Sequence, residues 1–398
     1  MDKHTTMKQG TSAARMREIQ PFHVMALLAE ARQREAAGQD IIHLEVGEPD
    51  FPTPAPIVAA GIRALQMGQT KYTPACGLPA LREAIATYYA SRFGVTIASQ
   101  RIIVTPGASG ALQLVLGALL NPGNEVLMTD PGYPCNRHFV RLFEGKPVGI
   151  PVGADTTYQL NGAHIQAHWN ANTRAVMLAS PANPTGTVLS VPQLADIYRA
   201  VRQRGGELIV DEIYQGLTYG VPDTTALAVD AENIWVINSF SKYFGMTGWR
   251  LGWVVAPEWA VATLDRLAQN IFLAASTPAQ YAALAAFTPE ALAIMAVQRQ
   301  ELQRRRDFLL PALRELGFSV RIEPQGAFYI YAGSERFGDD AQALCANLLD
   351  KTGVVFTPGI DFGSYQATTH VRFAYTTPTT RLEQAVERLA LGLRGWRG

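Results

Sequence analysis

The chain has 398 residues, of which 48% are hydrophobic and 17% are charged. These proportions are typical of a globular protein with a large core, and the length fits two or three domains. Lysine and arginine total 34, as do aspartate and glutamate. The chain therefore lacks the basic surplus that a nucleic-acid-binding protein needs to neutralise phosphates, and we expect a small-molecule partner and no nucleic acid.

Cysteine usage and hydropathy narrow the class of protein further. Cys76, Cys135 and Cys345 are too few and too widely spaced for a disulfide framework, and no C-x-x-C pair indicates structural zinc. No run approaches the ~18 consecutive apolar residues of a membrane helix. The polar stretch Met1–Gly10 lacks the apolar core of a secretory signal. The sequence thus predicts no metal, no membrane and a cytoplasmic location.

The predicted elements begin with a helix over Pro21–Gly38, which Gly38 ends. The middle of the chain then alternates short apolar runs with helical patterns, which predicts an α/β fold with a mostly parallel sheet. Several runs are continuously apolar, as expected for strands covered on both faces. The candidate strands are Arg101–Thr105, Glu125–Thr129, Ala175–Ala179, Leu208–Val210, Ile234–Asn238 and Leu251–Val255, and the helices between them include Gly110–Leu120 and Val191–Arg204.

The C-terminal part has a different pattern. A long helix over Pro289–Glu315 precedes two predicted antiparallel strands, Ser319–Glu323 and Ala327–Tyr331, and a helix over Asp340–Lys351. This pattern predicts a smaller α+β domain, which the N-terminal segment joins in space. The expected division is 1–50 for the N-terminal segment, 51–288 for the large domain and 289–398 for the small domain.

The segment Asn238–Arg250 carries the most unusual residues of the chain. It follows an apolar run, so its polar side chains emerge from the end of a predicted strand. Of six lysines, only Lys242 lies among small and aromatic residues after a buried strand. A desolvated lysine has a lowered pKa and supplies the neutral amine that a Schiff base requires. Ser-x-Ser-Lys alone is more often a loop cap, but Arg250 in Gly-Trp-Arg-Leu-Gly, eight residues later, favours a catalytic lysine.

Four more polar segments stand where predicted strands end. Val104–Leu112 opens a helix with small residues that let a backbone approach a phosphate, although the dinucleotide pattern G-x-G-x-x-G is absent. Asp130–Pro134 has the composition of a turn, and Ser180–Gly186 contains Asn-Pro-Thr-Gly. The fourth, Ile209–Tyr214, places Asp211 at a strand end, where the simplest role is a helix cap.

Taken together, these segments resemble the aminotransferases of PLP fold type I, the aspartate-aminotransferase-like superfamily of class I and II aminotransferases. The resemblance covers nearly the whole chain, from about Pro21 onwards, with five motifs in family order. It implies a mostly parallel central sheet flanked by helices, with a smaller α+β domain formed by the N-terminal segment and the C-terminal part. It also implies transfer of an amino group from an amino acid to a 2-oxo acid through a pyridoxal 5'-phosphate Schiff base on Lys242.

The resemblance also assigns the other contacts to the cofactor. Phosphate is a dianion that suits a guanidinium, hydroxyls and helix-start amides, and the ring nitrogen stays protonated beside a carboxylate. The implied phosphate contacts are Ser239, Arg250, Gly107, Ala108 and Ser109, with Ser241 in some members; Tyr133 stacks on the ring, Asn183 and Tyr214 bind its phenolic oxygen, and Asp211 faces its nitrogen.

Three more residues concern the substrate and the assembly. The resemblance implies that Arg372, in the run Val371–Ala374, clamps the substrate α-carboxylate and that Gly47 contacts it through the backbone. Asn183 is also expected among the substrate-binding residues. In relatives the tyrosine that corresponds to Tyr72 reaches the phosphate of the neighbouring subunit, so the resemblance implies a homodimer with shared active sites.

Specificity depends on the expected substrate entrance, Pro21–Met25, which is largely apolar. Gly117 is neutral where some aspartate-specific relatives carry lysine. We therefore expect neutral or aromatic amino acids as substrates, unless Arg137, Arg141 or a partner's arginine enters the pocket.

Two alternatives stay open on the same residues. A PLP-dependent β-lyase or related synthase shares this fold and cofactor. An effector module of a transcription regulator is disfavoured, because about twenty residues precede the first predicted helix and the net charge is zero.

Overall fold

The computed structural model describes residues 12–19, 23–394 and 396. Within them a seven-stranded sheet has the order β2-β8-β7-β6-β5-β3-β4. Its strands are β2 (Ile102–Thr105), β3 (Glu125–Asp130), β4 (Lys146–Pro151), β5 (Thr173–Ala179), β6 (Glu207–Asp211), β7 (Trp235–Ser239) and β8 (Gly252–Val255). All neighbours pair in parallel except β8, which is antiparallel to β2 and β7. The predicted mostly parallel sheet is confirmed.

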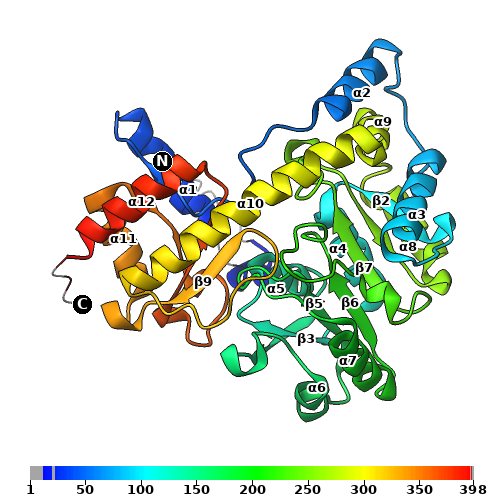
Figure 1. The fold of residues 1–398 in the computed structure, drawn as a ribbon. Helices are drawn as coiled ribbons and strands as arrows, with labels where there is room; N and C mark the ends of the chain where they lie inside the picture. Colours follow the sequence, from blue (N-terminus) through cyan, green and yellow to red (C-terminus); the bar gives the residue numbers. More distant parts are fainter. Residues whose placement is uncertain (1–11, 20–22, 395, 397–398) are drawn as a thin grey trace, which may run out of the picture.

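Both faces of this sheet are buried, which explains the continuously apolar strands. Along β5, Ala175 and Met177 belong to one hydrophobic cluster, and Val176 and Leu178 belong to the other. Helices α4 (Gly107–Leu119) and α8 (Val261–Ile271) contribute to the first cluster. Helices α3 (Pro79–Phe93) and α7 (Val191–Gln203) contribute to the second. The sheet is therefore flanked by helices on both faces, as Figure 1 shows.

A second group of elements lies beside the large sheet. Strands β9 (Tyr329–Gly333), β11 (Thr357–Pro358) and β12 (His370–Ala374) form an antiparallel sheet with β12 in the centre, and β1 (Ile42–His43) pairs in parallel with β10 (Val354–Val355). Helix α10 (Pro289–Leu316) runs from the large sheet to this group (Figure 1). The remaining helices are α1 (His23–Ala36), α2 (Ala55–Gln66), α5 (Pro134–Leu142), α6 (Gly162–His168), α9 (Thr277–Leu284), α11 (Ala341–Thr352) and α12 (Thr379–Gly392).

Two regions differ from the sequence-based expectation. The predicted strand Ser319–Glu323 is wrong, because this stretch forms only one antiparallel bridge, from Ser319 to Gly333. The carbonyl of Val320 is occupied by the guanidinium of Arg314, at 3.0 Å from Nη2. Strand β4 has no counterpart among the predicted strands, because two prolines and a glycine obscure its pattern; as an edge strand it tolerates them.

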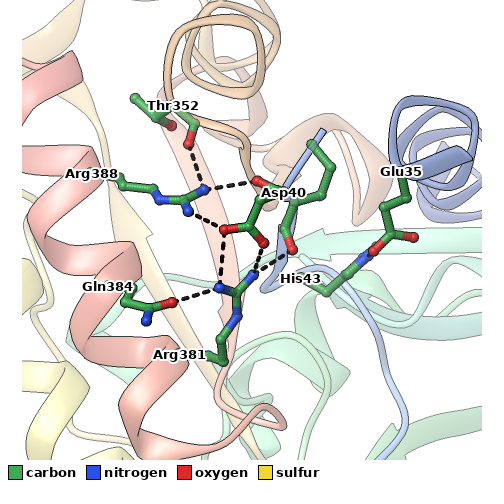
Figure 2. Close-up of polar contacts among 8 residues, drawn as sticks. Glu35, Asp40, His43, Thr352, Arg381, Gln384 and Arg388 are labelled. Atoms are coloured by element: carbon green, nitrogen blue, oxygen red, sulfur yellow. Dashed lines mark hydrogen bonds and ion pairs between the residues drawn. The ribbon is translucent and has the colours of Figure 1, made fainter. Parts of the chain in front are cut away.

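The N-terminal segment is attached to the C-terminal helices by ion pairs (Figure 2). The Asp40 carboxylate accepts hydrogen bonds from Arg381, at 2.6 Å, and from Arg388, both on α12. Arg388 also donates to the backbone carbonyl of Asp40, at 2.8 Å. The hydrogen bonds from Arg381 and Arg388 lower the pKa of Asp40 to about 2. The described part of the segment 1–50 thus contacts the C-terminal part through Asp40, while the division at 50/51 and 288/289 stays a prediction.

In the described part of the chain, no single helix is both long and apolar enough to cross a membrane. The segments Thr277–Phe287 and Pro289–Leu316 pass this test only as a pair, with a bend of 81° between them.

Candidate active site

Lys242 lies just after the carboxyl end of β7, with its Nζ 2.6 Å from the carbonyl oxygen of Gly47. The same Nζ is 5.9 Å from the ring centroids of Tyr214 and Phe328. Burial lowers the pKa of Lys242 to about 8, although nearby Glu48 opposes the shift. At pH 7 about a tenth of such a lysine is the neutral amine, far more than for an ordinary lysine, which suits a nucleophile or a base.

Asp211 ends the neighbouring strand β6 and is 4% exposed. Burial raises its pKa to about 6, although the amide of Ile213 and the charge of Lys242 oppose the shift. Its Oδ1 accepts that amide at 3.1 Å, so the simple capping role is present as well. Because the carboxyl ends of parallel strands meet at one edge of the sheet, Asp211 and Lys242 share an edge where ligands commonly bind.

The start of α4 forms a cradle with the loop that precedes β8. Gly107 has φ +68°, and a Cβ added there would lie 2.7 Å from Nη2 of Arg250. A Cβ on Gly252 would lie 2.7 Å from the amide nitrogen of Ala108. The start of α4 at Gly107 and Ala108 therefore packs against Arg250 and Gly252 with only glycine-sized clearance, and Ser109 is the next residue of this helix. This arrangement fits a phosphate group.

Two serines lie on the other side of Lys242 in the sequence. Ser239 lies at the end of β7. Its Oγ accepts a hydrogen bond from the Ser241 amide at 3.0 Å and donates one to the Leu251 carbonyl at 3.3 Å. Both serines are buried. Their positions beside the lysine add hydroxyl donors to the same edge of the sheet.

A chain of buried side chains supports Ser239, and the sequence did not reveal it. The Glu212 carboxylate accepts a hydrogen bond from Gln215 Nε2 at 2.7 Å, and Gln215 Oε1 accepts one from Asn238 Nδ2 at 2.9 Å. Asn238 Oδ1 then accepts the amide of Ser239 at 2.7 Å. Burial raises the pKa of Glu212 to about 8. Nothing in Asp-Glu at a strand end distinguishes the second acid from a surface residue, so only the packing identifies it.

Arg372 lies in the central strand β12 and is 2% exposed. Its Nη1 donates to Asn183 Oδ1 at 3.0 Å, and its Nη2 donates to the Glu45 carbonyl at 2.6 Å. The Tyr329 ring centroid lies 4.1 Å from its Cζ, and that of Phe362 lies 4.8 Å away. Its Nε has no hydrogen-bond partner among the described residues. A buried guanidinium with a spare donor fits a carboxylate ligand.

Two buried tyrosines link the surroundings of Lys242 to those of Arg372: Tyr214 lies near the lysine and Tyr329 near the arginine. The hydroxyl oxygens of Tyr214 and Tyr329 are 2.9 Å apart, and burial raises the pKa of both. A Cβ added to Gly47 would lie 2.7 Å from Tyr329 Oη, so the backbone of this segment packs on the phenol. Tyr329 was not among the candidate residues. Its sequence signal, a tyrosine in an apolar run, is the same as that of a core residue.

A cavity of about 180 Å³ lies beside these residues. Tyr133 and Asn183 line it, so it adjoins the position expected for the cofactor ring. Its other lining residues include the apolar side chains of Met128, Met177 and Phe362 and the two arginines Arg137 and Arg141 of α5.

The two arginines supply the positive charge that the entrance segment was expected to lack. Arg137 donates from Nη2 to the Asp361 carbonyl at 2.6 Å, and burial lowers its pKa. Arg141 pairs with the carboxylate of Glu18 at 3.2 Å. The exception named from the sequence, an arginine entering the pocket from Arg137 or Arg141, is therefore what the structure shows. Pro21 and Phe22 of the entrance segment lie outside the described residues, and Met25 is 55% exposed.

Tyr72 is not brought to the site within one chain. It lies in the loop after α2 and is 83% exposed. Separately, no group of three or more histidine, cysteine, aspartate or glutamate side chains that could hold a metal ion occurs among residues 12–19, 23–394 and 396.

Comparison with known proteins agrees with this geometry. Residues 39–389 match the family model described as aminotransferase class I and II. The valine–pyruvate aminotransferase of Mycobacterium tuberculosis is 38% identical over 93% of this chain and 96% of its own length. A probable aspartate/prephenate aminotransferase of Aquifex aeolicus is 34% identical over 97% of this chain and 99% of its own length.

A solved structure extends the comparison to the fold. Aspartate aminotransferase from Thermus thermophilus with maleate superposes with a TM-score of 0.91 at 32% identity, covering 97% of this chain and all of that one. Members of this family use pyridoxal phosphate, and the phosphate cradle, the buried acid and the lysine with a lowered pKa fit that group. The chain belongs to the class I and II aminotransferases and is a pyridoxal-phosphate-dependent transaminase.

Proposed function

We propose that this aminotransferase acts on neutral or aromatic amino acids and that Lys242 is the residue to which its cofactor is bonded. The observation that carries the assignment is the convergence of the Lys242 amine, the Asp211 carboxyl and the Arg250–Gly107 cradle at one edge of the sheet. When bound, pyridoxal phosphate supplies an electron sink for the bonds at the Cα of the amino acid.

The protein residues hold and orient the reacting groups. Asp211, ionised above a pH of about 6, would keep a proton on the nitrogen of the cofactor ring. Lys242, with a pKa of about 8, would accept a proton from the substrate at Nζ and return it. Arg250, Ser239, Ser241 and the amides of Gly107, Ala108 and Ser109 would hold the phosphate, and Tyr133 would stack on the ring while Asn183 and Tyr214 bind its phenolic oxygen.

The substrate would be oriented by its α-carboxylate. Arg372 is buried, its Nε has no hydrogen-bond partner among the described residues, and its Nη1 contacts Asn183. The Gly47 backbone stands next to Lys242 Nζ and would close the site over the substrate. The same Arg372 would bind both the amino acid and the 2-oxo acid, since both carry this carboxylate.

The cavity beside Tyr133 supports apolar side chains as substrates. Burying an apolar side chain against Met128, Met177 and Phe362 is favourable by roughly 25 cal/mol per Å². Arg137 and Arg141 in the same lining favour a second candidate, a dicarboxylate such as 2-oxoglutarate as the acceptor. The names of relatives include both valine–pyruvate and aspartate/prephenate aminotransferases, and one solved relative contains maleate.

Initial rates across a panel of amino donors and 2-oxo acids test this proposal. We expect kcat/KM to be higher for alanine, valine or phenylalanine than for aspartate. A preference for aspartate over every neutral donor would contradict the donor class. The variant Arg137→Gln then shows whether this arginine is responsible, and ammonia release in place of amino transfer would indicate the lyase alternative.

We also propose a homodimer with shared active sites. Tyr72 is exposed in the single chain, and apolar side chains on and after α2 are exposed with it: Ile62, Leu65 and Met67. Mixing Tyr72→Phe and Lys242→Ala homodimers should restore partial activity, because one site of the heterodimer combines an intact lysine with an intact tyrosine. Verified subunit exchange without restored activity would contradict shared sites.

We also propose a cytoplasmic location, because the cysteines are free thiols. Cys76, Cys135 and Cys345 are all described and none forms a disulfide, as expected in a reducing compartment. Cell fractionation against a cytoplasmic marker tests this proposal.

A further inference from the structure

Backbone carbonyls in the segment that follows β1 accept hydrogen bonds from two side chains of the proposed site, Arg372 and Lys242. The Glu45 carbonyl accepts Arg372 Nη2 at 2.6 Å, and the Gly47 carbonyl accepts Lys242 Nζ at 2.6 Å. Leu44 is held on two sides, since its amide donates to the Val355 carbonyl at 2.8 Å and its own carbonyl accepts the Ala374 amide at 2.6 Å. A shift of this short segment would therefore move the acceptor of Arg372.

The side chain of Glu45 is a buried carboxylate next to that acceptor. It is fully buried, with Oε1 2.7 Å from Nδ1 of His43. Its second oxygen, Oε2, has no hydrogen-bond partner among the described residues. His43 is partly exposed, and its Nε2 lies 3.1 Å from Oε1 of Glu35 on α1. Figure 2 shows His43 beside Glu35. The imidazole thus bridges a surface carboxylate and a buried one.

This bridge is satisfied only when both ring nitrogens carry a proton, because each faces a carboxylate oxygen. The hydrogen bond to Glu45 is the main cause that raises the pKa of His43, and Glu35 adds to it. Two other acids near His43 in the sequence have their own partners, since Asp40 binds Arg381 and Arg388 (Figure 2) and Asp50 binds Arg305. His43 is therefore the one cationic partner of the Glu45 carboxylate among the described ion pairs.

Removing that partner would leave a buried charge without compensation, which proteins avoid by moving the group towards water or by protonating it. Because Glu45 is 0% exposed, moving its carboxylate towards water would disturb the packing of this residue, whose carbonyl is the acceptor of Arg372. The geometry thus links the His43–Glu45 pair to the guanidinium, although neither side chain contacts the expected position of the substrate.

We propose that His43 and Glu45 are positioning residues for Arg372, and that their ion pair sets the affinity of the site for the α-carboxylate of the substrate. This inference rests on the proposed role of Arg372 as the carboxylate clamp. It adds two residues that the cofactor and substrate contacts do not include.

The test uses the holoenzyme and 3-phenylpropionate, a carboxylate without an amino group, with its Kd measured by calorimetry at about pH 6.5, near the ordinary pKa of histidine. His43→Leu should raise the Kd by about tenfold, which corresponds to about 1.4 kcal/mol. His43→Gln, which keeps a donor for Glu45, should recover part of this loss. Glu35→Gln is the matched control on the exposed side and should change the Kd by less than about twofold.

A second arm uses pH. As pH rises through the pKa of His43, the ring loses one N–H and the wild-type Kd should rise. Glu45→Gln should lack this component, because a neutral amide needs no imidazolium. In the holoenzyme Lys242 is bonded to the cofactor, so the pKa of its free amine does not enter, and any titration at the cofactor is common to both proteins and cancels in the comparison.

The variants distinguish failure of the Arg372 clamp from failure of the positioning role of His43 and Glu45. If Arg372→Lys binds 3-phenylpropionate like the wild type, the proposed clamp fails. If Arg372→Lys loses binding while folded His43→Leu keeps the wild-type Kd, the clamp stands and the positioning role is wrong. Should His43→Leu not fold, His43→Gln and Glu45→Gln decide: identical pH dependence of Kd in Glu45→Gln and wild type would overturn the proposal.

Discussion

The large sheet and the small antiparallel sheet supply their parts of the site in different ways. Asp211 and Lys242 stand at the carboxyl ends of adjacent parallel strands, where the backbone ladder sets their separation. Arg372 instead lies in the middle of β12, and its position depends on a carbonyl of Glu45, 327 residues away in the sequence.

The two arrangements respond differently to perturbation. At the edge of the large sheet, burial shifts the pKa of Asp211 up and that of Lys242 down, so this region prepares the chemistry. Around Arg372, the contacts are hydrogen bonds to Asn183 and to a docked segment. We therefore expect changes at the sheet edge to affect kcat and changes around Arg372 to affect binding.

The largest effect should follow Lys242→Ala. Loss of the amine at the strand end should lower kcat by about 10³-fold or more, because no other described lysine lies at this edge. Borohydride reduction of the holoenzyme followed by peptide mapping identifies the attachment site. Lys146→Ala, which removes a surface ion pair with Glu125, is the control. A phosphopyridoxyl label on any other lysine refutes the assignment.

Asp211→Asn should separate catalysis from stability. We expect a loss in kcat of about 10²-fold or more, because an amide cannot hold the ring proton. The folded pKa of Asp211, about 6, is above its unfolded value, so its ionisation destabilises the apoprotein as pH rises from about 4 to 6, by about 3 kcal/mol in total.

The apoprotein of Asp211→Asn should therefore unfold at a higher temperature than the wild type at pH 7 and show no such gain at pH 4. Thermal unfolding at the two pH values measures this difference. Near-normal turnover of the holoenzyme would mean that Asp211 is only the cap of the Ile213 amide.

Arg372→Lys should act mainly on binding. A lysine cannot form two parallel hydrogen bonds to a carboxylate, so KM for the amino donor should rise by about tenfold to a hundredfold. The absorption spectrum of the bound cofactor should shift only slightly, because Arg372 reaches the expected cofactor position only through Asn183. An equal fall in kcat with unchanged KM would contradict the distinction between the two regions.

The smallest effect should follow Asp40→Asn. Asp40 attaches the N-terminal segment to α12 through Arg381 and Arg388, which lower its pKa to about 2. A lowered carboxyl pKa contributes stability at neutral pH that is lost as pH falls from about 4 to 2. The variant should show a slightly lower Tm at pH 7 and no difference from the wild type at pH 2. An increase in KM without a change in Tm would instead extend the carboxylate-binding region to Asp40.

Much of the large sheet could be predicted from the sequence because both faces are buried. Continuous apolar runs such as Ala175–Ala179 then mark strands, and the polar residues that follow them mark the edge that binds ligands. The edge strand β4 was not predicted from the sequence. An edge strand pairs with only one neighbour and so tolerates prolines and glycine, which hide its apolar pattern.

What the sequence by itself determined is therefore the local part of the site: strand ends, a helix that opens within Val104–Leu112 and a lysine after a buried strand. Only the tertiary structure decided that Glu45 offers its carbonyl to Arg372, that Tyr329 faces Tyr214, and that Arg137 and Arg141 line the cavity. The physical reason is that periodicity and turn chemistry act over a few residues, whereas these contacts join segments that meet only when the two sheets and the N-terminal segment pack together.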